Sequence, residues 1–165
     1  GFVELTPHGS ARVATVTADE AREIYELRVL LEPVALREAI GVATPDDHAR
    51  WRTSFDASMQ DGDALTRLRR HGAFHRSLIS PCPSRWMLRT LIPLQDGAQR
   101  IVASIGEREE TPHRGPGRHR ALLDLALAGD ALSAERELAA HLAASLDSFI
   151  DQLTPAPRSD QSGAS

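Results

Sequence analysis

Residues 64–79 read ALTRLRRHGAFHRSLI and set the pattern for the rest of the chain. One set of side chains recurs here at spacings of three and four, namely Leu68, His71, His75, Leu78 and Ile79. That spacing returns each side chain to the same face of a 3.6-residue helix. The stretch therefore predicts a helix whose inward face carries two imidazoles one turn apart.

The same helical period extends in both directions from this stretch. On the N-terminal side, Thr17 and Glu20 have the spacing of a capping box, and Thr44-Pro45-Asp46-Asp47 is a second helix start. On the C-terminal side, a long helix is expected from Trp86 to Ile105, another from His119 to Ala128, and a last one from near Asp130 to Leu153. The predicted inward faces include Ile24, Leu27, Leu31, Val34 and Ala35, then Trp51, Phe55 and Met59, and then Trp86, Leu88, Leu91, Leu94, Ala98, Ile101 and Ile105. We predict an all-α fold, an antiparallel bundle of six or seven helices, with Gly41 and Gly129 just past two helix ends.

The two ends of the chain differ in composition from this helical part. Residues 1–17 alternate and are rich in β-branched side chains, which predicts short extended segments and a linker. Residues 106–117 and 155–165 are polar and rich in Gly, Pro or Ser, which predicts a loop and a disordered tail. The helical domain is expected to span residues 18–154.

Composition limits the classes of function. The net charge of −4 does not suit a chain that binds nucleic acid through a basic face, because phosphate contacts need positive charge. Cys82 is the only cysteine, so no internal disulfide can form, which fits a reducing cytoplasm. No run of apolar residues approaches the length of a membrane span, so no membrane partner is expected.

Four histidines fall on predicted inward faces of three helices. His71 and His75 lie on one helix, His119 shares a face with Leu122, and His141 shares a face with Leu138. Buried polar groups cost free energy without partners, and an i,i+4 pair of imidazoles can bind one metal ion. The alternative is a set of hydrogen-bonded core histidines, and the pattern alone leaves the two interpretations about even. His8, His48 and His113 fall in loops or at polar positions and are not candidates.

Arg28 is a positive charge on the apolar face of the first predicted helix. A buried guanidinium requires an anion. The simpler partner is Glu32, one turn along the same helix. The functional partner would be a carboxylate of a ligand, held by two parallel hydrogen bonds.

Several segments resemble the FCD effector domain of FadR-type GntR transcription regulators. The run from Tyr25 to Ala35 is similar to the family's R-x-x-L-E opening, and Phe74-His75 is similar to its D-x-x-F-H motif. Residues 119–130, HRALLDLALAGD, resemble its H-x-x-I-x-x-A-I-x-x-G-D segment, and Ala134 with His141-Leu142 matches its closing A…H-L. Four motifs in order, over residues 18–153, make the resemblance fairly specific.

The resemblance implies a sensing domain and not an enzyme. Many family members bind a divalent metal through one Asp and three His, and the metal and a nearby Arg hold the carboxylate of a small metabolite. The three histidines carry over to His75, His119 and His141, the Asp position falls on His71, and the Arg carries over to Arg28. A fourth imidazole in place of the carboxylate favours zinc or nickel over manganese or magnesium. The resemblance also implies a homodimer, and it makes residues 1–17 the end of a winged-helix wing plus a linker, so that operator DNA would be bound only through a missing N-terminal domain.

Two other classes of function remain open at this point. One is a metal-dependent helical-bundle enzyme, although no inward carboxylate accompanies the histidines as a general base. The other is a metal-free bundle for ligand binding or dimerisation.

Overall fold

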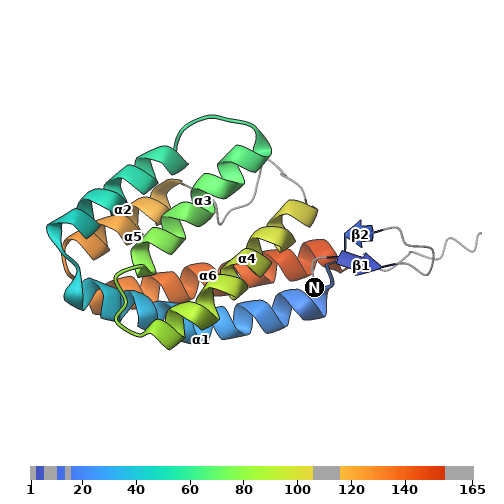
Figure 1. Ribbon diagram of the computed structural model, residues 1–165, viewed down its shortest axis with the longest axis horizontal. Helices are drawn as coiled ribbons and strands as arrows, with labels where there is room; N and C mark the ends of the chain where they lie inside the picture. Colours follow the sequence, from blue (N-terminus) through green and yellow to red (C-terminus); the bar gives the residue numbers. More distant parts are fainter. Residues whose placement is uncertain (1–2, 6–10, 14–15, 106–115, 155–165) are drawn as a thin grey trace, which may run out of the picture.

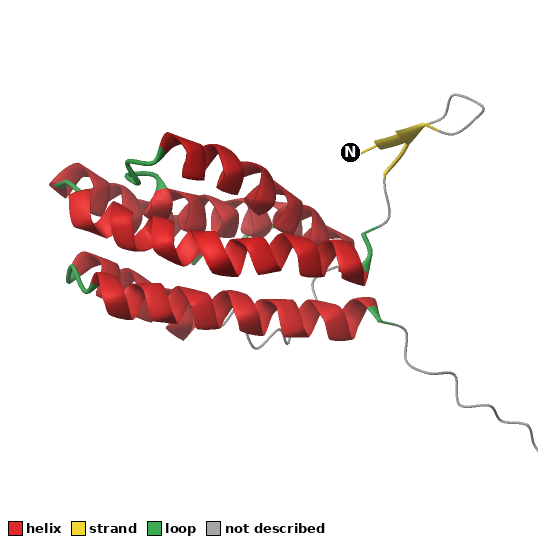
Figure 2. Ribbon diagram, turned by 90° about the horizontal axis from the view of Figure 1, so that it is seen from below, coloured by secondary structure: helices red, strands yellow, loops and turns green. Residues whose placement is uncertain are grey.

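The computed structural model describes residues 3–5, 11–13, 16–105 and 116–154. These residues form two short strands and six helices (Figures 1 and 2). The strands are β1 (Val3–Leu5) and β2 (Ala11–Val13), which pair antiparallel with Val3 opposite Val13. The helices are α1 (Ala18–Val42), α2 (Pro45–Ser58), α3 (Ala64–Ile79), α4 (Arg85–Ile105), α5 (Pro116–Leu127) and α6 (Ala131–Leu153). The all-α fold with a short extended N-terminal segment is thus confirmed.

Helix starts follow side-chain chemistry closely. Thr17, Asp63 and Asp130 each accept a hydrogen bond from the backbone N–H three residues later, which satisfies a donor that the first turn leaves open. Thr44 and Asp47 form a complete capping box at the start of α2. Gly129 follows α5 with φ of 75°, a left-handed conformation that glycine adopts at little cost.

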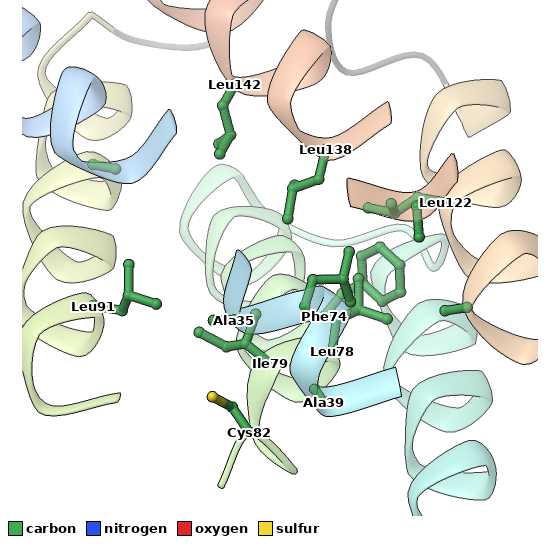
Figure 3. Packing of buried hydrophobic residues seen from close by; sticks show 14 of the residues in the cluster. Ala35, Ala39, Phe74, Leu78, Ile79, Cys82, Leu91, Leu122, Leu138 and Leu142 are labelled. Atoms are coloured by element: carbon green, nitrogen blue, oxygen red, sulfur yellow. The ribbon is translucent and has the colours of Figure 1, made fainter. Parts of the chain in front are cut away.

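The helices form two groups that share a core (Figure 1). Helices α1, α4 and α6 pack along one another, and α2 packs against α3 and α5. Between α1 and α6, the rings of Tyr25 and Phe149 meet edge to face at 5.4 Å. Between α2 and α3, Phe55 and Phe74 do the same at 5.5 Å. Figure 3 shows the centre of this core, where α3 contributes Phe74, Leu78 and Ile79, α1 contributes Ala35 and Ala39, and α6 contributes Leu138 and Leu142.

Ion pairs join the long helices at their surfaces. Arg37 of α1 contacts Glu135 of α6 at 3.0 Å, and Arg76 of α3 contacts Asp96 of α4 at 2.6 Å. Arg100 of α4 pairs with Glu20 of α1. These contacts hold α1 and α4 beside α3, where the candidate site lies.

Several sequence-based details are wrong. Leu27, Met59 and Trp86, which were predicted to face inward, are 45%, 42% and 76% exposed. Helix α1 buries Tyr25, Arg28 and Glu32 instead, because the two charged side chains neutralise each other inside.

Two predicted helix boundaries also shift, and one predicted capping box is incomplete. Helix α1 includes Gly41 and ends at Val42, and α5 begins at Pro116, before His119. In the capping box predicted for Thr17 and Glu20, the Glu20 side chain forms an ion pair with Arg100. The structure therefore confirms only the hydrogen bond that the Thr17 side chain accepts from the backbone of Glu20. The predicted tail, 155–165, and most of the predicted loop, 106–117, lie outside the described residues.

Candidate functional site

The four predicted histidines come together inside the bundle. Helix α3 supplies His71 and His75, α5 supplies His119, and α6 supplies His141. One ring nitrogen of each lies within 4.8 Å of the corresponding atoms of the others. His75, His119 and His141 are buried, with exposures of 5%, 2% and 5%, and His71 is half-buried. Periodicity had placed each residue on an inward face, and the packing of three helices makes them neighbours.

Three of the four imidazoles point the same nitrogen at a common centre. The Nε2 atom of His71 is 3.0 Å from that of His119 and 3.2 Å from that of His75. The Nε2 atoms of His75 and His119 are 3.1 Å apart. The ring of His141 stacks on that of His75 at 5.2 Å and meets that of His119 edge to face at 4.8 Å.

Hydrogen bonds cannot satisfy this triangle of Nε2 atoms. Each imidazole nitrogen either carries a proton and donates, or lacks one and accepts. With three atoms and two states, at least two atoms are in the same state, so at least one of the three close contacts is repulsive. A cation inside the triangle removes the conflict, because all three nitrogens can then direct a lone pair at it.

The spacing of the nitrogens suits a metal ion. Tetrahedral zinc with bonds of about 2.0–2.1 Å places its nitrogen ligands roughly 3.3–3.4 Å apart. The three observed separations, 3.0–3.2 Å, are slightly shorter than that. The donor set therefore fits a divalent metal that accepts imidazole ligands.

The surroundings of His75 keep its imidazole neutral. Burial lowers the pKa of His75 well below its usual range, and the nearby imidazoles and Arg28 lower it further. A neutral imidazole is the form that binds a metal. At neutral pH a metal ion therefore does not have to displace the second proton of an imidazolium at His75.

The remaining histidines do not join the cluster. His48 lies on α2, half-buried, with its ring 5.1 Å from that of Trp51. His8 and His113 lie outside the described residues. The expectation that His48 has no part in the cluster agrees with its position.

A cavity of about 40 Å³ adjoins the histidines. It lies between α1, α3 and α4, and its walls include His71, His75 and Arg28. A buried water needs roughly 10–15 Å³ by this measure, so the cavity has room for about three waters or a group of similar size. Two of the four candidate metal ligands and the candidate carboxylate clamp thus line one space.

Arg28 is held in place by a buried ion pair. Its Nε donates to Glu32 at 2.8 Å, and its guanidinium lies 4.7 Å from the centre of the Tyr25 ring. Burial alone would lower the pKa of Arg28, but the Glu32 carboxylate and Tyr25 outweigh it and raise that pKa above its usual value. The predicted partner Glu32 is therefore confirmed, and Arg28 also lines the cavity.

Sequence reasoning missed the wall that α4 contributes. Gln95 and Gln99 lie one turn apart on α4 and line the cavity opposite α3. Gln95 is buried and its Nε2 donates to Glu32 at 2.9 Å. A signal for Gln95 was available in the sequence, because it lies four residues after Leu91 and three before Ala98. Both of these residues are buried. The neighbouring Leu94, which is half-buried, obscured that signal.

The family of the chain follows from a match that covers most of this architecture. The family model described as the FCD domain matches residues 23–144, which include all four histidines and Arg28. The chain belongs to the FCD domain family. An FCD domain is a ligand-sensing regulatory domain of GntR-type regulators, so this FCD domain is regulatory and not enzymatic, as the sequence predicted.

Solved structures of regulators share the fold. A GntR family transcriptional regulator from Pseudomonas syringae pv. tomato superposes with a TM-score of 0.71 at 23% identity, over 92% of this chain and 65% of that one. McbR/YncC of E. coli gives a TM-score of 0.76 at 18% identity, over 91% of this chain and 77% of that one. Lar, which controls expression of the Listeria monocytogenes agr system, gives 0.65 at 14% identity, over 93% and 74%. The FCD domain thus spans about two thirds of the length of the Pseudomonas regulator.

No curated protein matches the chain by sequence. Among the described helices, none combines the length and the apolar character that crossing a membrane requires.

Proposed function

We propose that this FCD domain senses a small carboxylate metabolite through a divalent metal ion held by His71, His75, His119 and His141. The observation that carries the proposal is the convergence of three Nε2 atoms, 3.0–3.2 Å apart, beside a cavity that Arg28 also lines. The metal supplies positive charge to one carboxylate oxygen. Arg28, whose position the pair with Glu32 fixes, acts as the second clamp on the carboxylate.

The ligand set favours zinc or nickel. All four proposed ligands are histidines, which bind a metal as uncharged nitrogen donors, whereas manganese and magnesium prefer sites rich in carboxylate oxygens. His71 stands where the resembling family pattern has an aspartate. The site consequently lacks one negative charge, which softens it and leaves more positive charge for the effector to neutralise.

The proposal for the whole regulator extends beyond this chain. Its structural relatives include transcription regulators, and a net charge of −4 suits a sensing module better than a DNA-reading one. We assign residues 1–17 to the end of a winged-helix wing and its linker, and residues 18–154 to the sensing domain. Operator DNA would then be bound by an upstream winged helix-turn-helix, in the cytoplasm and by a homodimer. Effector binding would modulate that DNA binding.

The decisive experiment couples metal to effector. A carboxylate at one hundred times its dissociation constant adds about 2.7 kcal/mol of stability. For a domain of this size each kcal/mol raises the melting temperature by roughly 2–4 °C, so a shift of roughly 5–10 °C is expected. The protein is melted with a panel of small mono- and dicarboxylates and hydroxy acids, before and after chelation. Chelation and His75→Ala should both abolish the shift.

Matched variants separate the roles of the residues. His48→Ala removes a half-buried histidine outside the cluster and should leave both bound metal and the carboxylate shift unchanged. Arg28→Lys keeps a positive charge beside Glu32 but loses the planar fork, so it should reduce the carboxylate shift at unchanged metal content. A carboxylate shift that survives chelation would show that the histidines form a hydrogen-bonding pocket and would refute the metal site.

A further inference from the structure

The amide of Gln95 has a fixed orientation in the cavity wall. Its Nε2 donates to Oε1 of Glu32 at 2.9 Å, while Oε2 of the same carboxylate accepts from Arg28 at 2.8 Å. A carboxylate that pairs with a guanidinium is ionised and only accepts hydrogen bonds. The amide must therefore turn its NH₂ toward Glu32, and its Oε1 is the end that remains for another partner.

Within the part of the chain that the structure describes, that oxygen lacks a donor. Gln95 is only 4% exposed, and among the described residues no group donates a hydrogen bond to its Oε1. A buried acceptor without a partner costs free energy, and such groups in native proteins usually have a specific reason. Gln95 lines the same cavity as Arg28, His71 and His75, so the donor comes from what occupies the cavity, a water in the free protein or a group of the effector in the complex.

The charges around the cavity select the kind of donor. Arg28 is balanced by Glu32, and the proposed ion would add two positive charges that histidine ligands, as uncharged donors, do not offset. An ammonium group would bring a third positive charge into this partly desolvated space, where like charges repel strongly. A hydroxyl group can donate to Oε1 of Gln95 without adding charge.

We infer that Gln95 determines specificity, and that the effector is a hydroxycarboxylate whose hydroxyl donates a hydrogen bond to Oε1 of Gln95. The inference rests on the proposed function, since the metal and Arg28 hold the carboxylate of the same molecule. The room in the cavity, about 40 Å³, limits the part of the effector that enters it to the carboxylate and its substituted neighbouring carbon.

Gln99 provides a matched control on the same wall. It lies one turn after Gln95, lines the same cavity and is half-buried. Its amide packs over Gly72 so closely that a Cβ at residue 72 would be 2.4 Å from Nε2 of Gln99. Gln99→Met and Gln95→Met thus make the same chemical change on one helix, but only Gln95 presents the buried acceptor.

The test measures binding of acid pairs to the metal-loaded full chain by calorimetry. The pairs are lactate with propionate and malate with succinate, which differ in one hydroxyl, and alanine supplies the ammonium analogue of lactate. The wild type should bind each hydroxy acid at least about tenfold more tightly than its partner, the range expected when a buried acceptor gains or loses its donor. Alanine should bind more weakly than lactate. Gln95→Met should reduce the ratio within each pair to about one, and Gln99→Met should leave the ratio unchanged.

The outcomes separate this inference from the proposed function. Equal binding of both members of each pair by the wild type, or a preference for alanine, overturns the hydroxyl assignment and leaves the metal–carboxylate site standing. If Gln95→Met weakens both members equally, Gln95 acts only through Glu32 and the specificity role is wrong. If none of these acids binds the metal-loaded protein, both proposals fall. The ratio of affinities within each acid pair is measured on the wild type alone. It therefore tests the inference even if Gln95→Met fails to fold.

Discussion

Residue 71 sets the charge of the proposed metal site, because it carries an imidazole where the resembling motif carries a carboxylate. His71→Asp should therefore keep metal bound but move its preference toward manganese, which favours oxygen ligands. The resembling motif has an aspartate at this position, so we expect a carboxylate here to reach the ion.

The measurement is elemental analysis of protein incubated with equimolar zinc, nickel and manganese and then desalted. The manganese fraction should rise in His71→Asp and stay at the wild-type value in His48→Asp. An unchanged metal ratio in His71→Asp would show that residue 71 does not contact the ion.

Glu32 is the residue whose loss the fold should tolerate least. Its side chain is fully buried and neutralises Arg28 at 2.8 Å, while Gln95 occupies its other oxygen. Removing one partner of a buried ion pair strands the other charge, which costs about 3–5 kcal/mol. Glu32→Ala should lower the free energy of unfolding by that amount in a urea titration.

The exposed pair Asp19–Arg22 on the same helix is the control for Glu32→Ala. Asp19→Ala should cost only about 0–1 kcal/mol. A Glu32→Ala variant as stable as Asp19→Ala would contradict the buried pair.

At the residue scale, the sequence located the histidines but not the amides. His71 and His75 interrupt an apolar stripe on one helix, and that interruption is visible in the sequence of this helix alone. The meeting of α3, α5 and α6 depends on packing across the bundle, which periodicity does not contain. Gln95 was missed because its importance comes from Glu32, a residue of another helix, and not from its own neighbours in sequence.

At the element scale, helix ends were easier to predict than helix faces. Thr44 and Asp47 define the start of α2 through local hydrogen bonds, which the sequence displays directly. The inward face of α1 was misassigned because Arg28 and Glu32, charged residues that read as exposed, are buried as a pair. Leu27 and Trp86, which the pattern placed inward, are by contrast 45% and 76% exposed. A hydrophobic pattern does not by itself show which apolar side chains the core of the domain buries.

The capping box of α2 predicts a pH dependence. Hydrogen bonds from the Thr44 side chain and backbone, together with Arg50, lower the pKa of Asp47. A carboxyl with a lower pKa in the folded state stabilises the fold above its unfolded pKa, and the effect is lost as the pH falls through the folded value. The free energy of unfolding of the wild type should exceed that of Asp47→Asn by about 1 kcal/mol at pH 7. This difference should close as the pH falls below about 4.

Chemical denaturation between pH 7 and pH 3 measures the gap between wild type and Asp47→Asn. Asp46→Asn removes a charge from the same first turn, where the side chain is exposed, and controls for the loss of a carboxylate alone. A gap between wild type and Asp47→Asn that stays constant with pH would show that the ionised carboxyl is not what stabilises the helix start.

At the scale of the whole molecule, the exposed apolar side chains of α1 and α4 support the proposed homodimer. Leu27 and Leu30 on α1 and Trp86 and Ile92 on α4 are 45%, 66%, 76% and 39% exposed. Two-fold symmetric operators are read by two-fold symmetric proteins, so a GntR-type regulator needs a self-complementary face. Large aromatic residues often supply much of the energy of such interfaces.

The two most exposed of these side chains give the test of the dimer. Leu30→Arg and Trp86→Arg should each raise the dimer dissociation constant by at least about thirtyfold, which corresponds to roughly 2 kcal/mol. Analytical ultracentrifugation at micromolar concentration measures this dissociation constant. Leu65→Arg and Leu132→Arg place the same charge at residues that are 52% and 59% exposed on α3 and α6, and they should leave the dimer intact. A wild-type monomer at micromolar concentration refutes the dimer, and dissociation caused only by the α3 or α6 variants moves its interface to those helices.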